Sequence, residues 1–151
     1  MKLLLIIGLL LLSTIPALFA QITDADKLLG VWQTAEKDGK IDLYKSGTTY
    51  AGKLIWAIDM FERDGKPRGA AQSKPDANNP DPALRNRPLQ NLVILTGFSY
   101  RDGVWGGGSI YDPSSGKTYR CTMKLTNGKL DIRGYVGISL FGKTVTWNRV
   151  N

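Results

Sequence analysis

The sequence predicts an all-β domain of eight short antiparallel strands, arranged either as a barrel or as a sandwich. Two observations lead to this fold class. Runs of β-forming residues are separated by turn signals such as Asp38-Gly39, Asp102-Gly103 and Asn127-Gly128, because glycine tolerates the positive φ of a tight turn. Apolar and polar residues also alternate along several runs, as in strands with one buried face. The expected strands are 30–36, 39–45, 48–58, 91–101, 104–112, 117–125, 129–136 and 142–150.

The expected elements differ in how clearly their buried face can be predicted. A short helical turn over residues 24–29 precedes the first strand. Alternation is clearest in 117–125, where Tyr119, Cys121 and Met123 share one face, which we expect to be buried. The strand 91–101 carries apolar residues on both faces, so its periodicity does not identify the inner one.

The first twenty residues have the layout of a signal peptide. Lys2 is followed by an apolar run from residue 3 to 12, then by Pro16 and by Ala20 at the expected cleavage site. The run is shorter than the roughly 20 residues that a membrane-spanning helix needs. We therefore expect a signal peptide over 1–20, a single domain over 21–151, and a periplasmic or secreted protein that does not span the membrane. The residue directly after the expected cleavage site is not a cysteine, so we expect no lipoprotein anchor there.

The segment 59–90 interrupts the series of hairpins. It is rich in proline, glycine, asparagine and charge and has no sustained apolar period, which predicts a long loop. Its prolines favour an ordered cap, or lid, over one end of the domain. Arg85 and Arg87 lie on this loop, where two guanidinium groups could grip a carboxylate or phosphate. The alternative is that they pair with Asp76, Asp81 or loop carbonyls and hold the loop in shape.

The composition argues against most catalytic and metal sites. The chain has no histidine and one cysteine, Cys121, which has no evident activating base and is expected in the core. We predict no catalytic residue, no metal and no cofactor. Basic residues give a formal charge of +7, but they are scattered and form no nucleic-acid-binding motif. This charge favours anionic partners without identifying one.

Gly30-Val31-Trp32, at the start of the first strand, resembles the Gly-x-Trp signature of lipocalins and their calycin relatives. In that superfamily an arginine of the last strand packs over the tryptophan, and Arg149 stands at the matching place here. The resemblance implies that the two ends of the chain are joined by a cation–π contact with a structural role.

A broader resemblance covers most of the chain after residue 28. The sequence is similar to the bacterial exported family known as domain of unknown function 2147, apart from Gln90-Asn91, where that family usually has a glycine. The resemblance implies an eight-stranded antiparallel lipocalin-like β-barrel with a short N-terminal helical turn and a long capping loop, and it implies no mechanism. The matching segments are 29–32, 79–89, 107–113, 116–119, 133–137 and 146–150.

The leading hypothesis is that the barrel binds a small apolar or amphipathic ligand, possibly with an anionic head group. Aromatic residues could line the cavity, Asp112 in the 111–119 hairpin could bond a polar head group, and that hairpin could equally be only a well-formed turn. The alternatives are a module for protein–protein or anionic-surface interaction without an internal ligand, and an enzyme using Asp112, Lys117 and a tyrosine. The predicted ligand-binding residues are Trp56, Arg85, Arg87, Trp105, Tyr111, Asp112 and Tyr119.

Overall fold

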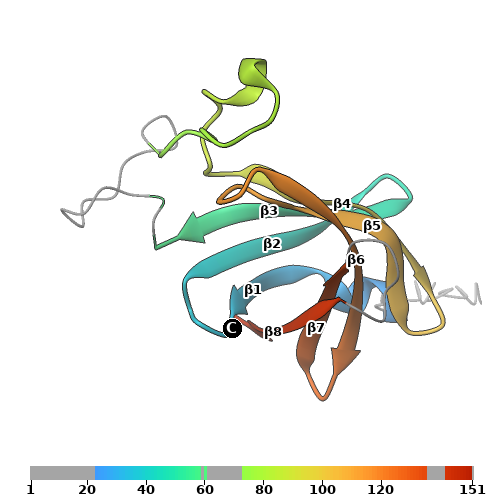
Figure 1. The fold of residues 1–151 in the computed structure, drawn as a ribbon. Helices are drawn as coiled ribbons and strands as arrows, with labels where there is room; N and C mark the ends of the chain where they lie inside the picture. Colours follow the sequence, from blue (N-terminus) through green and yellow to red (C-terminus); the bar gives the residue numbers. More distant parts are fainter. Residues whose placement is uncertain (1–22, 59, 61–72, 136–141, 151) are drawn as a thin grey trace, which may run out of the picture.

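The strands close into a barrel in the computed structural model, which describes residues 23–58, 60, 73–135 and 142–150 (Figure 1). Each strand pairs antiparallel with the next along the chain, and the last pairs with the first. The barrel alternative is therefore confirmed over the sandwich. The strands are β1 (Gly30–Thr34), β2 (Gly39–Ser46), β3 (Thr49–Ala57), β4 (Leu92–Arg101), β5 (Val104–Asp112), β6 (Lys117–Thr126), β7 (Lys129–Tyr135) and β8 (Lys143–Arg149).

The eight strands agree with the expected ranges to within a residue or two. The largest difference is at β1, which ends at Thr34 and not at residue 36. The Thr34 hydroxyl accepts hydrogen bonds from the backbone N–H groups of Asp38 and Gly39, at 3.1 and 3.0 Å, and so closes the turn early. Residues 1–20, where a signal peptide is expected, and most of the 59–72 stretch lie outside the described residues.

Strand β4 does not follow a simple alternation of buried and exposed residues, because two consecutive apolar residues are buried. Ile94 and Leu95 are both buried, whereas Val93 is 40% exposed on the outer face. The alternation of β4 changes phase here because its pairing register with β3 shifts on both sides of Gly52. A side chain at Gly52 would lie 2.9 Å from Leu95, so the glycine makes room for this leucine.

One end of the barrel, which we call the closed end, is covered by the 3-10 helix η1 (Asp24–Leu28). Two indole N–H groups donate to its backbone: Trp32 Nε1 to the Leu28 carbonyl at 2.9 Å, and Trp105 Nε1 to the Ala25 carbonyl at 3.1 Å. The Tyr50 hydroxyl donates to Asp26 at 2.6 Å. These bonds let large aromatic rings fill the interior without leaving buried polar atoms unpaired.

Arg149 joins the last strand to the first at this closed end. Its guanidinium lies 4.3 Å from the centroid of the Trp32 ring and donates to the carbonyls of Leu29, at 2.8 Å, and Lys27. Gly30 has a φ of +119°, and a Cβ there would lie 2.9 Å from Arg149 Nη1. The expected cation–π pair is present, and Gly30 is the residue that lets the arginine approach.

We predict that Arg149→Met lowers the free energy of unfolding by about 1 to 2 kcal/mol, the value of a partly desolvated cation–π pair. Methionine keeps an apolar stem over Trp32 but donates no hydrogen bond. Urea unfolding followed by tryptophan fluorescence measures the change. Arg101→Met, on an exposed arginine at the same end, is the control, and equal losses in the two variants would contradict a specific role for Arg149.

Candidate functional site

The candidate site lies at the other end of the barrel, which we call the open end. It is bordered by the 34–39 turn, the 112–117 turn and the segment 73–91. The segment extends beyond the strands in Figure 1, where it is yellow-green, and carries the short helix η3 (Pro82–Leu84). Two hollows open among these elements, while large side chains pack the interior beneath them.

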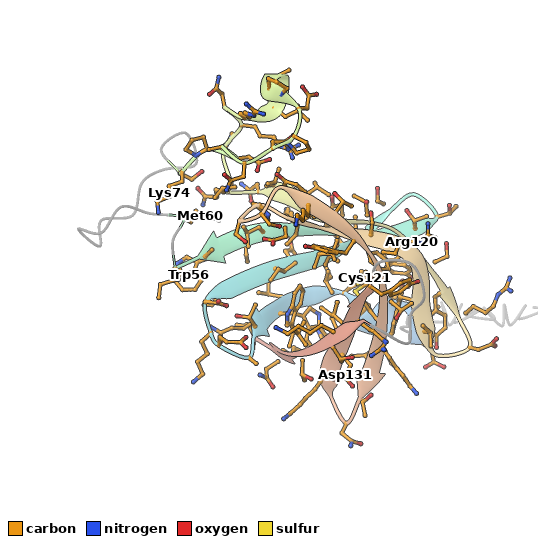
Figure 2. All side chains as sticks on the ribbon, in the orientation of Figure 1. Trp56, Met60, Lys74, Arg120, Cys121 and Asp131 are labelled. Atoms are coloured by element: carbon orange, nitrogen blue, oxygen red, sulfur yellow. The ribbon has the colours of Figure 1, made fainter. Side chains whose placement is uncertain are left out.

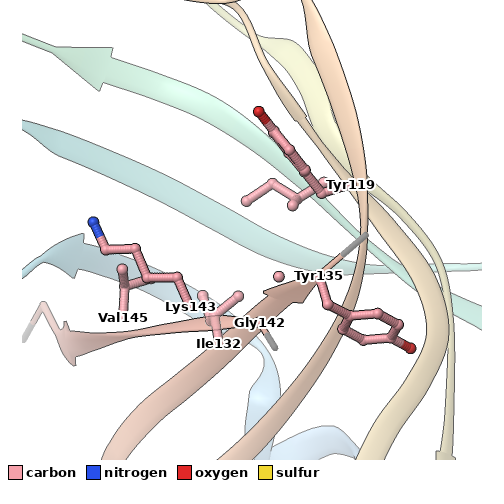
Figure 3. Close-up of a pocket in the computed structure, with 8 residues that line it drawn as sticks. Tyr119, Ile132, Tyr135, Gly142, Lys143 and Val145 are labelled. Carbon is pink, nitrogen blue, oxygen red and sulfur yellow. The ribbon is translucent and has the colours of Figure 1, made fainter. Parts of the chain in front are cut away.

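The first hollow, which we call the β5–β8 hollow, has a volume of about 470 Å³ (Figure 3). Its walls come from the last residues of β5 and β7 and the first residues of β6 and β8. Apolar groups of Ile110, Ile132 and Val145 form most of the surface. The complete lining is Ile110, Tyr119, Ile132, Gly134, Tyr135, Gly142, Lys143 and Val145.

Gly134 explains why no described side chain fills this part of the hollow. On β7 the inward positions are Leu130 and Ile132, both buried, and the next one is Gly134, which has no side chain. A Cβ at Gly134 would meet Ile110 and Tyr119 only at 3.9 and 4.0 Å, which is ordinary contact. The position can therefore hold a side chain, and its absence leaves space between β6 and β8.

Lys143 and Tyr119 supply the polar groups of the β5–β8 hollow. Lys143 pairs with Gly134 and occupies the same face of β8 as Val145 and the buried Trp147, so it is an inward position at the rim. In Figure 3 the Lys143 and Tyr119 side chains extend on one side of β7, and the Tyr135 ring extends on the other.

The second hollow, of about 580 Å³, lies between the opposite wall of the barrel and the segment 73–91. Ile41, Leu54 and Trp147 form its floor from inward strand positions. Lys74, Pro75, Ala77, Asn78 and Leu89 line it from the segment, and Asp112, Pro113 and Ser114 line it from the β5–β6 turn.

A buried carboxylate holds the segment 73–91 to the barrel. Asp76 is fully buried and accepts hydrogen bonds from the Tyr111 hydroxyl at 2.6 Å, from Asn79 Nδ2 at 2.8 Å and from Arg87 Nε at 3.0 Å. Arg87 Nη2 lies 2.9 Å from the same carboxylate. Burial and the bond to Asp76 raise the pKa of Tyr111 above its usual value. Because Tyr111 belongs to β5, this cluster joins the segment directly to the sheet.

The segment also packs closely against the turn after β5. Asn78 Nδ2 donates to the carbonyls of Pro113 and Ser114, at 3.3 and 2.9 Å. Gly116 has a φ of +69°, and a Cβ there would lie 1.9 Å from the Asn78 carbonyl oxygen. Only glycine fits both the left-handed backbone and this contact.

Asp112 stabilises the same turn. Its carboxylate accepts from the Ser114 backbone N–H at 2.9 Å and from the Ser114 and Ser115 hydroxyls at 2.6 Å each. Burial raises the pKa of Asp112, but these hydrogen bonds lower it by more, so the carboxyl titrates below its usual range. The bonding is that of the well-formed turn expected as the alternative, and Lys117 is exposed beside it.

The structure brings together some of the predicted ligand-binding residues. Tyr119 lines the β5–β8 hollow and Asp112 lines the second hollow, while Tyr111 and Arg87 meet in the Asp76 cluster. Arg85 is exposed, and its Nε donates to the Asn79 carbonyl at 2.7 Å. Both arginines thus make the contacts of the structural alternative.

The two predicted tryptophans lie away from the hollows. Trp56 lies at the end of β3 (Figure 2), where Lys40 of β2 stacks on its ring at 5.8 Å. Trp105 is buried near the closed end against η1. Sequence reasoning missed Ile110, Gly134, Lys143 and Val145. Strict alternation along β8 was the available signal, because it places Lys143 on the face of Val145 and Trp147.

The described residues contain no group of three or more acidic, cysteine or histidine side chains placed to hold a metal ion. Within the same part of the chain, no helix is long and apolar enough to cross a membrane. Cys121 is buried in the core, as expected.

These features define a lipocalin-like barrel, with η1 packed over one end and the two hollows described above at the other. The chain is similar to a solved structure described as "Protein HP1028 from the human pathogen Helicobacter pylori belongs to the lipocalin family", with 25% sequence identity, a TM-score of 0.68, and coverage of 82% of this chain and 83% of that one. Residues 30–149 match the family described as uncharacterized protein conserved in bacteria (DUF2147), and the chain belongs to that family. No curated protein matches it.

We predict that Cys121 is unreactive in the native protein. Burial raises the pKa of its thiol to about 12, so almost no thiolate exists at pH 8. Ellman's reagent should label the thiol only after urea unfolding. Rapid labelling of the folded protein would show that the core between β5 and β7 opens.

We also predict that Gly116→Ala releases the segment 73–91, because the new methyl group would overlap the Asn78 carbonyl. Amide exchange at Asp76 and Leu89, whose N–H groups donate to Arg87 and Lys74 carbonyls, should accelerate about tenfold or more, which corresponds to about 1.4 kcal/mol.

The matched control is Gly128→Ala. Gly128 has a similar φ of +76° but has nothing within 4 Å of its added Cβ, so it introduces the same backbone strain without the overlap. Unchanged exchange in Gly116→Ala, or equal acceleration in both variants, would argue against docking of the segment through this turn.

Proposed function

We propose that this protein holds a small apolar or amphipathic ligand in the open half of its barrel, in the bacterial envelope. The observation that carries the proposal is the β5–β8 hollow, where inward apolar residues of four strands face empty space. Its volume falls within the roughly 300 to 1,000 Å³ typical of small-molecule pockets. An eight-stranded barrel is wide enough to be filled by side chains or to hold one small ligand.

The contrast between the two ends of the barrel supports this proposal. Near the closed end the interior is filled by Trp32, Phe98 and Trp105, each at most 2% exposed. At the open end, Gly134 replaces the next inward side chain. Side chains that filled the open end would have stabilised the folded protein by about 25 cal/mol for each Å² of apolar surface they buried. Leaving one end empty forgoes that stabilisation, and a ligand that enters the hollow restores it.

The segment 73–91 has a defined place in this proposal. It walls the second hollow and is fixed to β5 by the Asp76 cluster, so it narrows the approach to the open end. Arg85 and Arg87 then serve to shape the segment. The envelope location rests on the signal peptide expected over residues 1–20.

A second candidate is docking to an anionic surface through the open end. The exposed large apolar residues of the described chain are Ile58, Leu84 and Val93, at 64%, 40% and 40% exposure, and each belongs to a part of the chain at that end. Lys40 stacks on Trp56 nearby. If the protein retains no small molecule and takes up no apolar probe, docking to an anionic surface becomes the better proposal, and the barrel then serves only as a scaffold.

We predict that Gly134→Leu abolishes ligand uptake. The Cβ fits without overlap and the rest of the side chain enters the β5–β8 hollow. Titration with a neutral fluorescent probe, N-phenyl-1-naphthylamine, should saturate with the wild-type protein and show at least about a tenfold weaker affinity with the variant.

The control for this titration is Gly106→Leu. Gly106 lies opposite the exposed Ser99, and a Cβ there meets only Thr122 at 4.0 Å, so the added leucine stays outside the hollow. Equal probe affinity in both variants and the wild type would place any binding elsewhere. Native mass spectrometry of the protein purified from its own host would then identify a retained molecule, or its absence.

A further inference from the structure

We infer that the ligand of the β5–β8 hollow is a single-chain amphiphile with an anionic head group, and that Lys143 at the rim is its counter-charge. This inference rests on the proposed function and adds the chemical class of the ligand. It also assigns the head group to Lys143 and not to Arg85 or Arg87, which bond within the segment 73–91. Four observations support it.

The first observation is the position of Lys143 in β8. It is the first residue of the strand and alternates in phase with Val145 and Trp147; its side chain is exposed at the rim and lines the hollow. Along this face of β8 the side chains therefore change from the ammonium group at the rim to apolar groups deeper in the barrel. An amphiphile that enters tail first would leave its head group beside Lys143.

The second observation is that Lys143 has no ionic partner among the described residues. The ion pairs there are Lys27–Asp24, Lys45–Asp26, Lys53–Asp42 and Arg87–Asp76. Lys143 is exposed to solvent at the rim of the apolar hollow, so its ammonium group can meet the head group of a bound amphiphile, and salt should screen this attraction.

The third observation is that four described carboxylates at the open end already have hydrogen-bond partners; Glu36, in the 34–39 turn, is exposed to solvent. Asp76 is bound by Tyr111 and Arg87, and Asp112 by Ser114 and Ser115. Asp38 accepts from the Thr34 hydroxyl, and Asp81 accepts from the Ala83 backbone N–H. None of these four carboxylates is bound by Lys143, so its ammonium group can meet an external anion.

The fourth observation is the second polar group of the hollow. Tyr119 pairs with Ile110 across β5 and β6, and it lines the hollow with Lys143. Its hydroxyl has no hydrogen-bond partner among the described residues. A carboxylate or a phosphate can accept from both an ammonium and a phenol, whereas the apolar walls of Ile110, Ile132 and Val145 suit an alkyl chain.

The test compares three ligands with the same alkyl chain: dodecanoate, dodecyl phosphate and dodecan-1-ol. Isothermal titration on the wild-type protein should give affinities for the two anions about fivefold to tenfold above that for the alcohol, as expected for one charge-assisted contact. Raising the salt concentration should weaken only the anions. The ratio between carboxylate and phosphate then distinguishes a fatty acid from a phosphate amphiphile.

Lys143→Met should remove the advantage of both anions and leave dodecan-1-ol binding unchanged, while Lys143→Arg should keep most of it. Lys117→Met, on an exposed lysine at the same end but outside the lining, should leave all three affinities unchanged and is the control for general surface charge.

The outcomes separate this inference from the function on which it rests. If all three ligands bind and Lys143→Met leaves the anion advantage intact, or if wild type binds the alcohol as well as the anions, the assignment of Lys143 is overturned and the binding function stands. If dodecan-1-ol, the two anions and the neutral probe all fail to bind, the proposed function is overturned, and the inference falls with it.

Discussion

The structure depends on the pairing of its first and last strands. This seam is short, joining Trp32, Gln33 and Thr34 to Arg149, Asn148 and Trp147. Without it the sheet would have two free edges and no enclosed interior. The Arg149 guanidinium strengthens the seam because it stacks on Trp32 and binds two carbonyls before β1. Closure then creates a single interior, whose contents differ from one end to the other.

That difference arises from the choice of inward residues. At the closed end, indole N–H groups find backbone partners on η1, so tryptophans can be buried without an unpaired donor. At the open end, the inward line of β7 ends in Gly134 and that of β8 ends in Lys143. The inward positions of β7 and β8 thus carry core side chains up to Ile132 and Val145. The next inward pair, Gly134 and Lys143, adds no apolar side chain, and the hollow lies there.

The strands and the turns could be predicted from the sequence because each has a local signal, whereas the closure of the barrel was expected only from the resemblance to lipocalins. Glycine-containing turns separate the strands, and Gly30, Trp32 and Arg149 indicate the seam. The phase of β4 was not predictable, because it depends on a register shift around Gly52 that only the paired strand β3 reveals. The unusual Gln90-Asn91 is accommodated because Asn91 takes the left-handed conformation, with a φ of 63°.

The site was harder to predict because a hollow depends on side chains that are absent. Aromatic residues were expected to line it, but Trp105 is packed against η1 and Trp56 pairs with Lys40. Arg87 pairs with Asp76, a partner named in the structural alternative, and the sequence alone could not choose between this contact and a ligand; the bridge between Pro75 and Pro88 brings the two parts of the segment together. Tyr119 was placed inward correctly, because its strand alternates regularly.

The seam also sets the order in which the protein can become complete. Its two strands are the first and the last in the sequence, so nearly the whole chain must leave the ribosome before β8 can pair with β1. Until then β1 and β7 present unpaired backbone groups, which are templates for pairing with other chains. Contacts between residues so distant in sequence also slow folding. A chain that ends before β8 lacks both the partner strand of β1 and Arg149, so its free strand edges remain open to pairing with other chains.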